Sequence, residues 1–152
     1  MTESGKPSYL GLLNAIALGE GCGREAFEAW AAHTRDPLLR PVLETVAARE
    51  GEHSESFAAR IRALGFEVEA RDFPALDRIR EVLSSDRPDM EKLRYLYPES
   101  GRAATDGDIF DNLLQDDSME DETRALMERY VAEERDSARL LREQLERLEA
   151  SA

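Results

Sequence analysis

The C-terminal part of the chain, from about Met119 to Glu149, contains no glycine or proline and repeats apolar residues every three or four positions. This spacing collects the apolar side chains on one face of an α-helix. At 1.5 Å per residue the predicted helix is roughly 45 Å long. Ser118 is expected to cap it, and the acidic residues at 120–122 suit the positive end of its dipole. A helix of this length needs other helices to cover its apolar face. That face comprises Met127, Tyr130, Glu134, Ser137, Leu141, Leu145 and Leu148.

The N-terminal half predicts two more helices. After a loose leader at residues 1–8, the first is expected over about 9–33. The second is expected to follow Asp36-Pro37, an N-cap with proline at the first helical position, and to reach about residue 64. Gly65 then supplies the left-handed residue that ends it. The predicted apolar faces comprise Leu13, Ile16, Glu20, Gly23, Phe27 and Trp30 in the first helix, and Leu39, Leu43, Val46, Glu50, His53, Phe57, Ile61 and Leu64 in the second.

The stretch from Phe66 to Ser118 is less regular. Apolar spacing predicts short helices at about 76–83 and 90–97, and a third short piece at about 109–114. We expect these to form a third bundle helix that is broken or shortened, after a long connection. No segment alternates apolar and polar residues as a strand does. The sequence therefore predicts one all-α domain over residues 1–152, a four-helix bundle with a broken or shortened third helix.

Composition excludes several classes of function. The chain has 152 residues, which suits a single domain, and a net charge of −13. A chain this acidic, with no basic patch, is not expected to bind nucleic acid. No stretch approaches the roughly 20 apolar residues of a membrane-spanning helix. The single cysteine, Cys22, cannot form an internal disulfide, and the N-terminus lacks a signal-peptide pattern, so a cytoplasmic location is expected.

Three glutamates differ from the other acidic residues. Glu20, Glu50 and Glu134 lie on the apolar faces of three different predicted helices, each near the middle of its helix. A buried carboxylate is costly unless it is paired, protonated or bound to metal. His53 lies three residues after Glu50 on the same face. A carboxylate and an imidazole aimed at one point suit iron or manganese.

This pattern resembles the ferritin-like superfamily, and is nearer to its rubrerythrin branch than to the cage-forming ferritins. The resemblance implies a four-helix bundle with a di-metal carboxylate centre. It also implies that Glu20, Glu50, His53 and Glu134 bind the metal. The resemblance is carried by Glu20 with Phe27 seven residues on, by Asp36-Pro37, by Glu50-Gly51-Glu52-His53, by Gly65 and by Glu133-Glu134-Arg135-Asp136-Ser137.

Two positions depart from the family pattern. The family carries a second Glu-x-x-His in its last helix, whereas here Glu134 is followed by Ser137, a poorer ligand for iron. The family also carries a glutamate on its third helix. Residues 101–105 contain none, and Asp106 is the nearest substitute. The four ligands named above suffice for one metal ion and leave two ions under-coordinated.

Three functions remain open at this level. The first is a metalloprotein with iron or manganese that acts on peroxide or dioxygen. The second is a metal-free scaffold that serves as a binding or dimerisation module. The third is a protein that binds a small molecule in the bundle core. A homodimer is expected because the apolar face of the last helix extends beyond the expected height of the bundle.

Two local features have alternative explanations. Glu50 and His53 either bind metal or form a buried hydrogen bond or an ion pair with Arg24 or Arg49. Glu20 is surrounded by three glycines, Gly19, Gly21 and Gly23. These either interrupt the helix or let another helix approach closely, and we expect the close approach.

Overall fold

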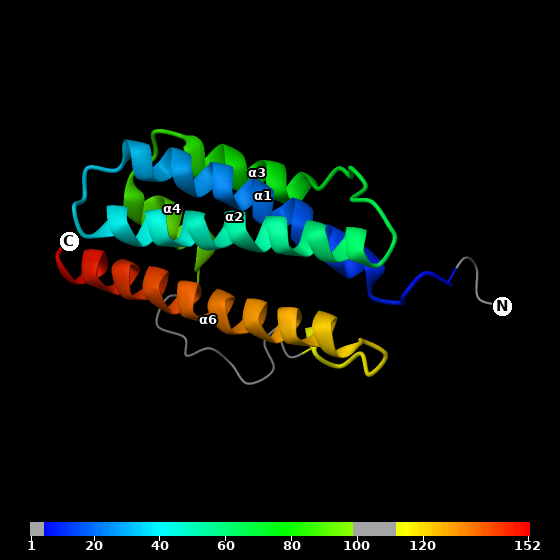
Figure 1. Ribbon diagram of the computed structural model, residues 1–152. Helices are drawn as coiled ribbons and strands as arrows, with labels where there is room; N and C mark the ends of the chain where they lie inside the picture. Colours follow the sequence, from blue (N-terminus) through cyan, green and yellow to red (C-terminus); the bar gives the residue numbers. More distant parts are fainter. Residues whose placement is uncertain (1–4, 99–111) are drawn as a thin grey trace.

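The computed structural model describes residues 5–98 and 112–152. Over these residues every regular element is a helix, and no strand occurs among them. The all-α prediction is therefore confirmed for the part of the chain that the structure describes. Figure 1 shows the elements, which are α1 (Leu10–His33), α2 (Leu39–Ala63), α3 (Pro74–Ser84), α4 (Asp89–Leu96) and α6 (Asp121–Ala150).

The helices pack mainly through α1 and α2, which lie side by side and antiparallel (Figure 1). Helix α3 packs on α1, and α6 lies along α2 and also contacts α4. Asp89, at the start of α4, accepts hydrogen bonds from Trp30 Nε1 at 2.8 Å and Thr34 Oγ1 at 2.8 Å. These bonds fix α4 against the end of α1.

The predicted boundaries of α2 follow from the residues at its ends. Asp36 Oδ1 accepts hydrogen bonds from the N–H groups of Leu38 and Leu39 at 2.9 and 3.0 Å. Asp36 therefore binds N–H groups at the start of the helix, but regular helix begins at Leu39 with Leu38 as its N-cap, so Asp36 is not the N-cap and Pro37 not the first helical residue. Gly65 has a φ of 92°, and the N–H of Phe66 donates to the carbonyl of Ile61 at 3.1 Å. The predicted left-handed end of α2 is confirmed.

The start of α6 differs from the prediction. The helix begins at Asp121, and its N-cap is Glu120 rather than Ser118. Asp116 explains the difference, because its carboxylate accepts hydrogen bonds from both the N–H and the hydroxyl of Ser118. The Ser118 side chain is therefore engaged two residues upstream and does not reach the helix. Acidic residues do occupy the first turn, as expected.

The two short helices predicted after Phe66 are present as α3 and α4. The region expected to supply the rest of a third bundle helix, including Asp106, Ile109 and Phe110, lies outside the described residues. Among the described residues, no helix is both long enough and apolar enough to cross a membrane.

Two apolar clusters occupy opposite ends of α1, α2 and α6. The first contains buried residues from the end of α1, the start of α2, the second half of α6, and α3 and α4. The second contains buried residues from the start of α1, the end of α2 and the first half of α6 together with Met119. The first apolar cluster comprises Ala26, Phe27, Trp30, Ala31, Leu39, Leu43, Val46, Ala47, Val82, Leu83, Leu93, Leu141 and Leu145. The second apolar cluster comprises Tyr9, Leu13, Ile16, Ala17, Phe57, Ile61, Met119, Met127, Tyr130 and Val131.

Candidate metal centre

A layer of polar residues separates the two apolar clusters. Three helices contribute to it, and each contributes from its middle turns, where neither cluster has a member. Close packing of α1 on α2 brings the layer together. We call this set the polar layer, and it comprises Glu20 of α1, Glu50 and His53 of α2, and Glu133, Glu134 and Ser137 of α6.

His53 lies at the centre of the polar layer and is fully buried, with 0% of its surface exposed. The aromatic ring of Tyr130 meets the imidazole edge-on, with ring centroids 5.0 Å apart. Tyr130 in turn packs against Phe57 of the second apolar cluster. The apolar residues therefore fix the plane of the imidazole and direct its two nitrogens to opposite sides.

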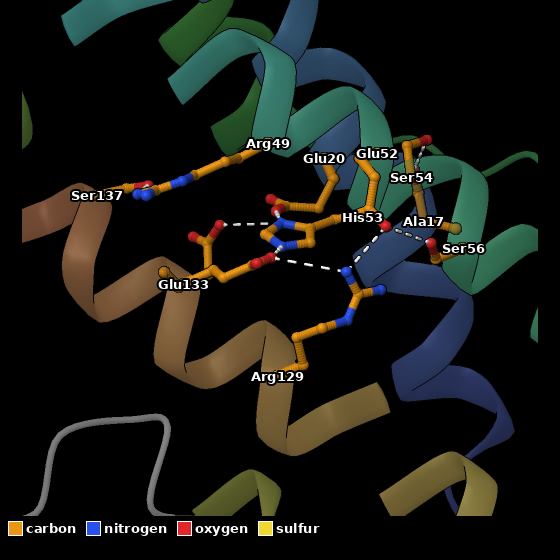
Figure 2. Close-up of polar contacts among 11 residues, drawn as sticks. Ala17, Glu20, Arg49, Glu52, His53, Ser54, Ser56, Arg129, Glu133 and Ser137 are labelled. Atoms are coloured by element: carbon orange, nitrogen blue, oxygen red, sulfur yellow. Dashed lines mark hydrogen bonds and ion pairs between the residues drawn. The ribbon is translucent and has the colours of Figure 1, made fainter. Parts of the chain in front are cut away.

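Carboxylates meet both nitrogens of His53. Nδ1 lies 2.9 Å from Glu20 Oε1 and 3.4 Å from Glu134 Oε1, while Nε2 lies 2.6 Å from Glu133 Oε1. Figure 2 shows the imidazole between α2 and α6, with the Glu20 side chain reaching it from α1. Three helices are therefore joined through one buried ring.

One oxygen in this cluster lacks a hydrogen bond. Glu134 Oε1 is buried and makes none, the only such side-chain atom among residues 5–98 and 112–152. Its neighbour His53 Nδ1 already contacts Glu20 at the shorter distance. A buried acceptor without a donor is unfavourable. A cation beside Nδ1 would remove that penalty.

On the Nε2 side of the imidazole, the carboxylate partner is partly exposed, although the ring itself is buried. The side chain of Glu133 is 34% exposed, and the Arg129 guanidinium lies 4.0 Å from its carboxylate. Arg129 also donates to Glu52 Oε1 at 2.9 Å. Figure 2 shows Arg129 between Glu52 and Glu133. A cationic side chain therefore already balances the outer carboxylates.

The electrostatics of the polar layer reflect an excess of carboxylates over cations. Burial raises the pKa of Glu20 to about 8, and the nearby charge of Glu134 adds to the effect, against the lowering influence of His53. Burial lowers the pKa of His53, but the Glu134, Glu20 and Glu133 carboxylates around its two nitrogens outweigh this effect and raise the value to about 10. At neutral pH, without a metal, the layer therefore retains protons on Glu20 and on both nitrogens of His53.

Glu50 occupies a different position from the one expected. Its side chain lies against Gly23 of α1, where a Cβ atom would overlap Glu50 Oε2. Burial and the charges of Glu20 and Glu134 raise its pKa well above the ordinary range, so it belongs to the same electrostatic environment. No group of potential ligand atoms within 4.8 Å of one another, among the described residues, includes Glu50. Glu20, His53 and Glu134 do form such a group.

His53 and Arg49 both have partners other than Glu50. His53 forms a buried hydrogen bond with Glu20 and a partly buried one with Glu133, rather than one with Glu50. Arg49 extends to α6 instead, where it donates to Ser137 Oγ at 3.1 Å and pairs with Asp136 at 2.9 Å. Ser137 is thus a partner of Arg49.

The glycines around Glu20 do not interrupt α1, which is continuous from Leu10 to His33. A Cβ at Gly21 would lie 3.1 Å from Ser54 Oγ, and Ser54 donates to the carbonyl of Ala17 at 2.8 Å. Gly23 makes room for Glu50 in the same way. The expectation of close packing between the helices is confirmed.

The apolar spacing placed Glu20, His53 and Glu134 on inward faces, but it did not predict the contact between Glu133 and His53. Glu133 lies one position off the apolar face of α6, so its position alone marks it as a solvated residue. A usable signal was the chemistry of His53, because a buried imidazole needs partners for both ring nitrogens. Asp106 lies outside the described residues.

The arrangement can hold a divalent cation beside His53 Nδ1. Glu20, Glu134 and Nδ1 supply three ligand atoms from three helices, and two carboxylates balance the charge of the cation. Nε2–H would keep its hydrogen bond to Glu133, and a carboxylate on the far nitrogen of a metal-bound histidine fixes its tautomer and orientation. Oxygen and imidazole ligands together suit iron and manganese.

Comparison of the chain with protein-family models, with curated proteins and with solved structures gave no match. The ferritin-like resemblance and the functions that it implies therefore stay predictions. The proposed function is based on the geometry of the polar layer.

Proposed function

We propose that this protein is a metalloprotein that binds one iron or manganese ion at Glu20, His53 and Glu134. The observation that carries the proposal is the convergence of the buried Glu20 carboxylate and the partly buried Glu134 carboxylate on one imidazole nitrogen, with Glu134 Oε1 left without a hydrogen bond. In the metal-free protein, protons on Nδ1 and on Glu20 hold these carboxylates together, whereas one metal ion beside Nδ1 would contact both of them. We further propose, following the ferritin-like resemblance, that the bound metal reacts with peroxide or dioxygen.

Each residue of the site has a distinct role in this proposal. Glu20 and Glu134 supply oxygen ligands and neutralise the cation, and His53 supplies Nδ1 after losing a proton. Glu133 accepts a hydrogen bond from Nε2–H and holds the ring in place. Metal binding releases protons, because Glu20 and Nδ1 hold them in the metal-free protein.

The chemistry follows from the number of protein ligands. A metal ion with open coordination positions acts as a Lewis acid and, when redox-active, exchanges electrons with peroxide or dioxygen. Three protein ligands leave such positions open. The apolar clusters flank the layer on both sides, and their low polarity strengthens electrostatic interactions within it.

A metal-free scaffold is the second candidate, and one observation favours it. Both nitrogens of His53 have carboxylate neighbours within 3 Å without any metal, and raised pKa values keep protons among them. In this alternative, hydrogen bonds that depend on these protons hold α1, α2 and α6 together in the polar layer.

The two candidates differ in metal content. The protein is purified from minimal medium and its metal content measured by elemental analysis. Fe(II) or Mn(II) is then titrated anaerobically into chelator-treated protein while the melting temperature is followed. The metalloprotein proposal predicts one ion per chain and a rise in melting temperature. No bound metal and no shift would overturn it in favour of the scaffold.

Matched variants locate the site. His53→Gln should abolish binding, whereas His33→Gln, which alters the chain's other histidine at the exposed end of α1, should leave it intact. Glu134→Gln should weaken binding, and the exposed Glu128→Gln on the same helix should not. Equal binding by His53→Gln and His33→Gln would show that metal binds elsewhere.

A further inference from the structure

We propose that Arg129 determines which nitrogen of His53 binds the metal, because it places a permanent positive charge on the Nε2 side of the ring. The inference rests on the proposed metal site, and it names the residue that selects one side of the imidazole. A neutral imidazole offers one unprotonated nitrogen to a metal, while the other nitrogen carries the proton. A single ion at His53 therefore binds either Nδ1 or Nε2.

Each side of the imidazole offers a group of three potential ligand atoms. The first group comprises His53 Nδ1, Glu20 and Glu134. The second group comprises His53 Nε2, Glu52 and Glu133. The closest carboxylate oxygen is 2.9 Å from Nδ1 and 2.6 Å from Nε2, so these distances do not favour the Nδ1 side. Another feature of the structure has to distinguish the two sides.

The guanidinium of Arg129 occupies the Nε2 side. Its Nη1 donates to Glu52 Oε1 at 2.9 Å and lies 4.0 Å from Glu133 Oε1. The same oxygen of Glu52 accepts a second hydrogen bond, from Ser56 Oγ at 3.0 Å. Figure 2 shows Arg129 reaching from α6 to this side of His53. A metal ion beside Nε2 would have to displace the guanidinium from its carboxylates, and would be repelled by its charge.

The Nδ1 side differs because no arginine or lysine pairs with its carboxylates. Within residues 5–98 and 112–152, Glu20 and Glu134 form ion pairs with His53 alone. Arg49 also extends from α2 to α6, but it pairs with Asp136 at 2.9 Å. Glu134 Oε1 has no hydrogen bond. A cation on this side therefore meets carboxylates that no other permanent cation neutralises.

Arg129 thus acts on the metal through the proton on Nε2. With the guanidinium in place, Nε2–H donates to Glu133 and Nδ1 is left for the metal. The hydrogen bond at one ring nitrogen of a histidine sets which nitrogen is metallated. Arg129 is therefore a positioning residue, which contacts Glu52 and Glu133 rather than the metal.

The inference is tested by NMR of the full chain with ¹⁵N-labelled histidine rings, with Zn(II) as a diamagnetic probe. The chain has two histidines, and His33 at the exposed end of α1 serves as an internal reference. In the wild type, Zn(II) should bind Nδ1 of His53 while Nε2 keeps its proton. In Arg129→Gln, signals of an Nε2-bound form should appear, and the share of this form should rise at least about tenfold. Glu52→Gln should weaken Zn(II) binding only in the Arg129→Gln background.

Two further variants separate the charge of Arg129 from other effects. Arg129→Lys keeps the charge and should retain the wild-type spectrum. Arg139→Gln removes another exposed arginine of α6 and should also retain it. An Arg129→Gln protein with Zn(II) on Nδ1 alone, or equal changes in Arg129→Gln and either control, would overturn the inference and leave the metal site intact. Zn(II) on Nε2 in the wild type, or no binding at His53, would overturn both the inference and the proposed site.

Discussion

The two apolar clusters and the polar layer lie on the same three helices and share the same spacing of inward-facing residues. The clusters stabilise the folded state, whereas burial of the polar layer destabilises it unless the charges are compensated. Burial of side chains such as Trp30 and Phe57 lowers the free energy of the folded state. Burial of Glu20, Glu50 and His53 instead requires protons, hydrogen bonds or a cation to offset desolvation. Apolar residues in the layer would give a more stable bundle. The layer is therefore the region where a function is to be sought.

The largest effect is expected from a truncation in an apolar cluster. Trp30 is fully buried in the first apolar cluster, and Trp30→Ala should cost about 3–5 kcal/mol of unfolding free energy, measured by urea denaturation. Leu38, which is 58% exposed, is the control, and Leu38→Ala should change stability by no more than about 0.5 kcal/mol. Equal losses in the two variants would mean that the cluster does not form.

The pH dependence of stability should come from the polar layer. The pKa of Glu20 is raised from 4.5 to about 8, so ionisation of Glu20 penalises the folded state as the pH rises toward 8. The pKa of His53 is raised from 6.5 to about 10, so the stability from its protonation is full below 6.5 and is lost as the pH rises through 10. Both groups predict that the metal-free protein loses a few kcal/mol between pH 6 and pH 9.

The variant Glu20→Gln tests whether the polar layer causes this pH dependence. An amide does not ionise, so urea unfolding of Glu20→Gln in chelator should depend less on pH between 6 and 9. The exposed Glu28→Gln on the same helix should retain the wild-type dependence. Identical profiles for Glu20→Gln and the wild type would contradict the assigned pKa of Glu20.

The smallest effect is expected at Glu50, and its sign is the informative part. Burial and the charges of Glu20 and Glu134 raise the pKa of Glu50, so its carboxylate adds cost to the metal-free fold. Glu50→Leu should therefore raise the unfolding free energy by about 1 kcal/mol at pH 7. Thermal and urea unfolding in chelator measure this change. A clear loss of stability would show that Glu50 is a structural partner, and would sharpen the division within the layer.

Helical spacing was enough to predict much of the fold. Leu13, Leu43, Phe57, Met127 and Leu145 were placed on inward faces by periodicity, and all are fully buried. The same spacing indicated the polar layer, because Glu20 and Glu134 interrupt otherwise apolar faces. Local chemistry also predicted the end of α2, where Gly65 takes a positive φ, and placed Asp36 near its start, where its carboxylate accepts from the N–H of Leu39.

Other features could not be predicted because they depend on packing between helices. Spacing along α2 placed Glu50 and His53 on one face, but only the absence of a side chain at Gly23 on α1 decides where the Glu50 carboxylate lies. Glu133 is off the apolar face of α6 and reaches His53 because α6 lies along α2. Ser118 has good capping chemistry, yet Asp116 binds it first.

The most direct measurement of the central claim is anomalous scattering from crystals grown or soaked with Mn(II). The account predicts a manganese peak on the Nδ1 side of His53, in contact with Glu20 and Glu134. Two results would contradict it. One is an empty site at full Mn(II) saturation. The other is a peak on the Nε2 side, between Glu52 and Glu133, where Arg129 now lies.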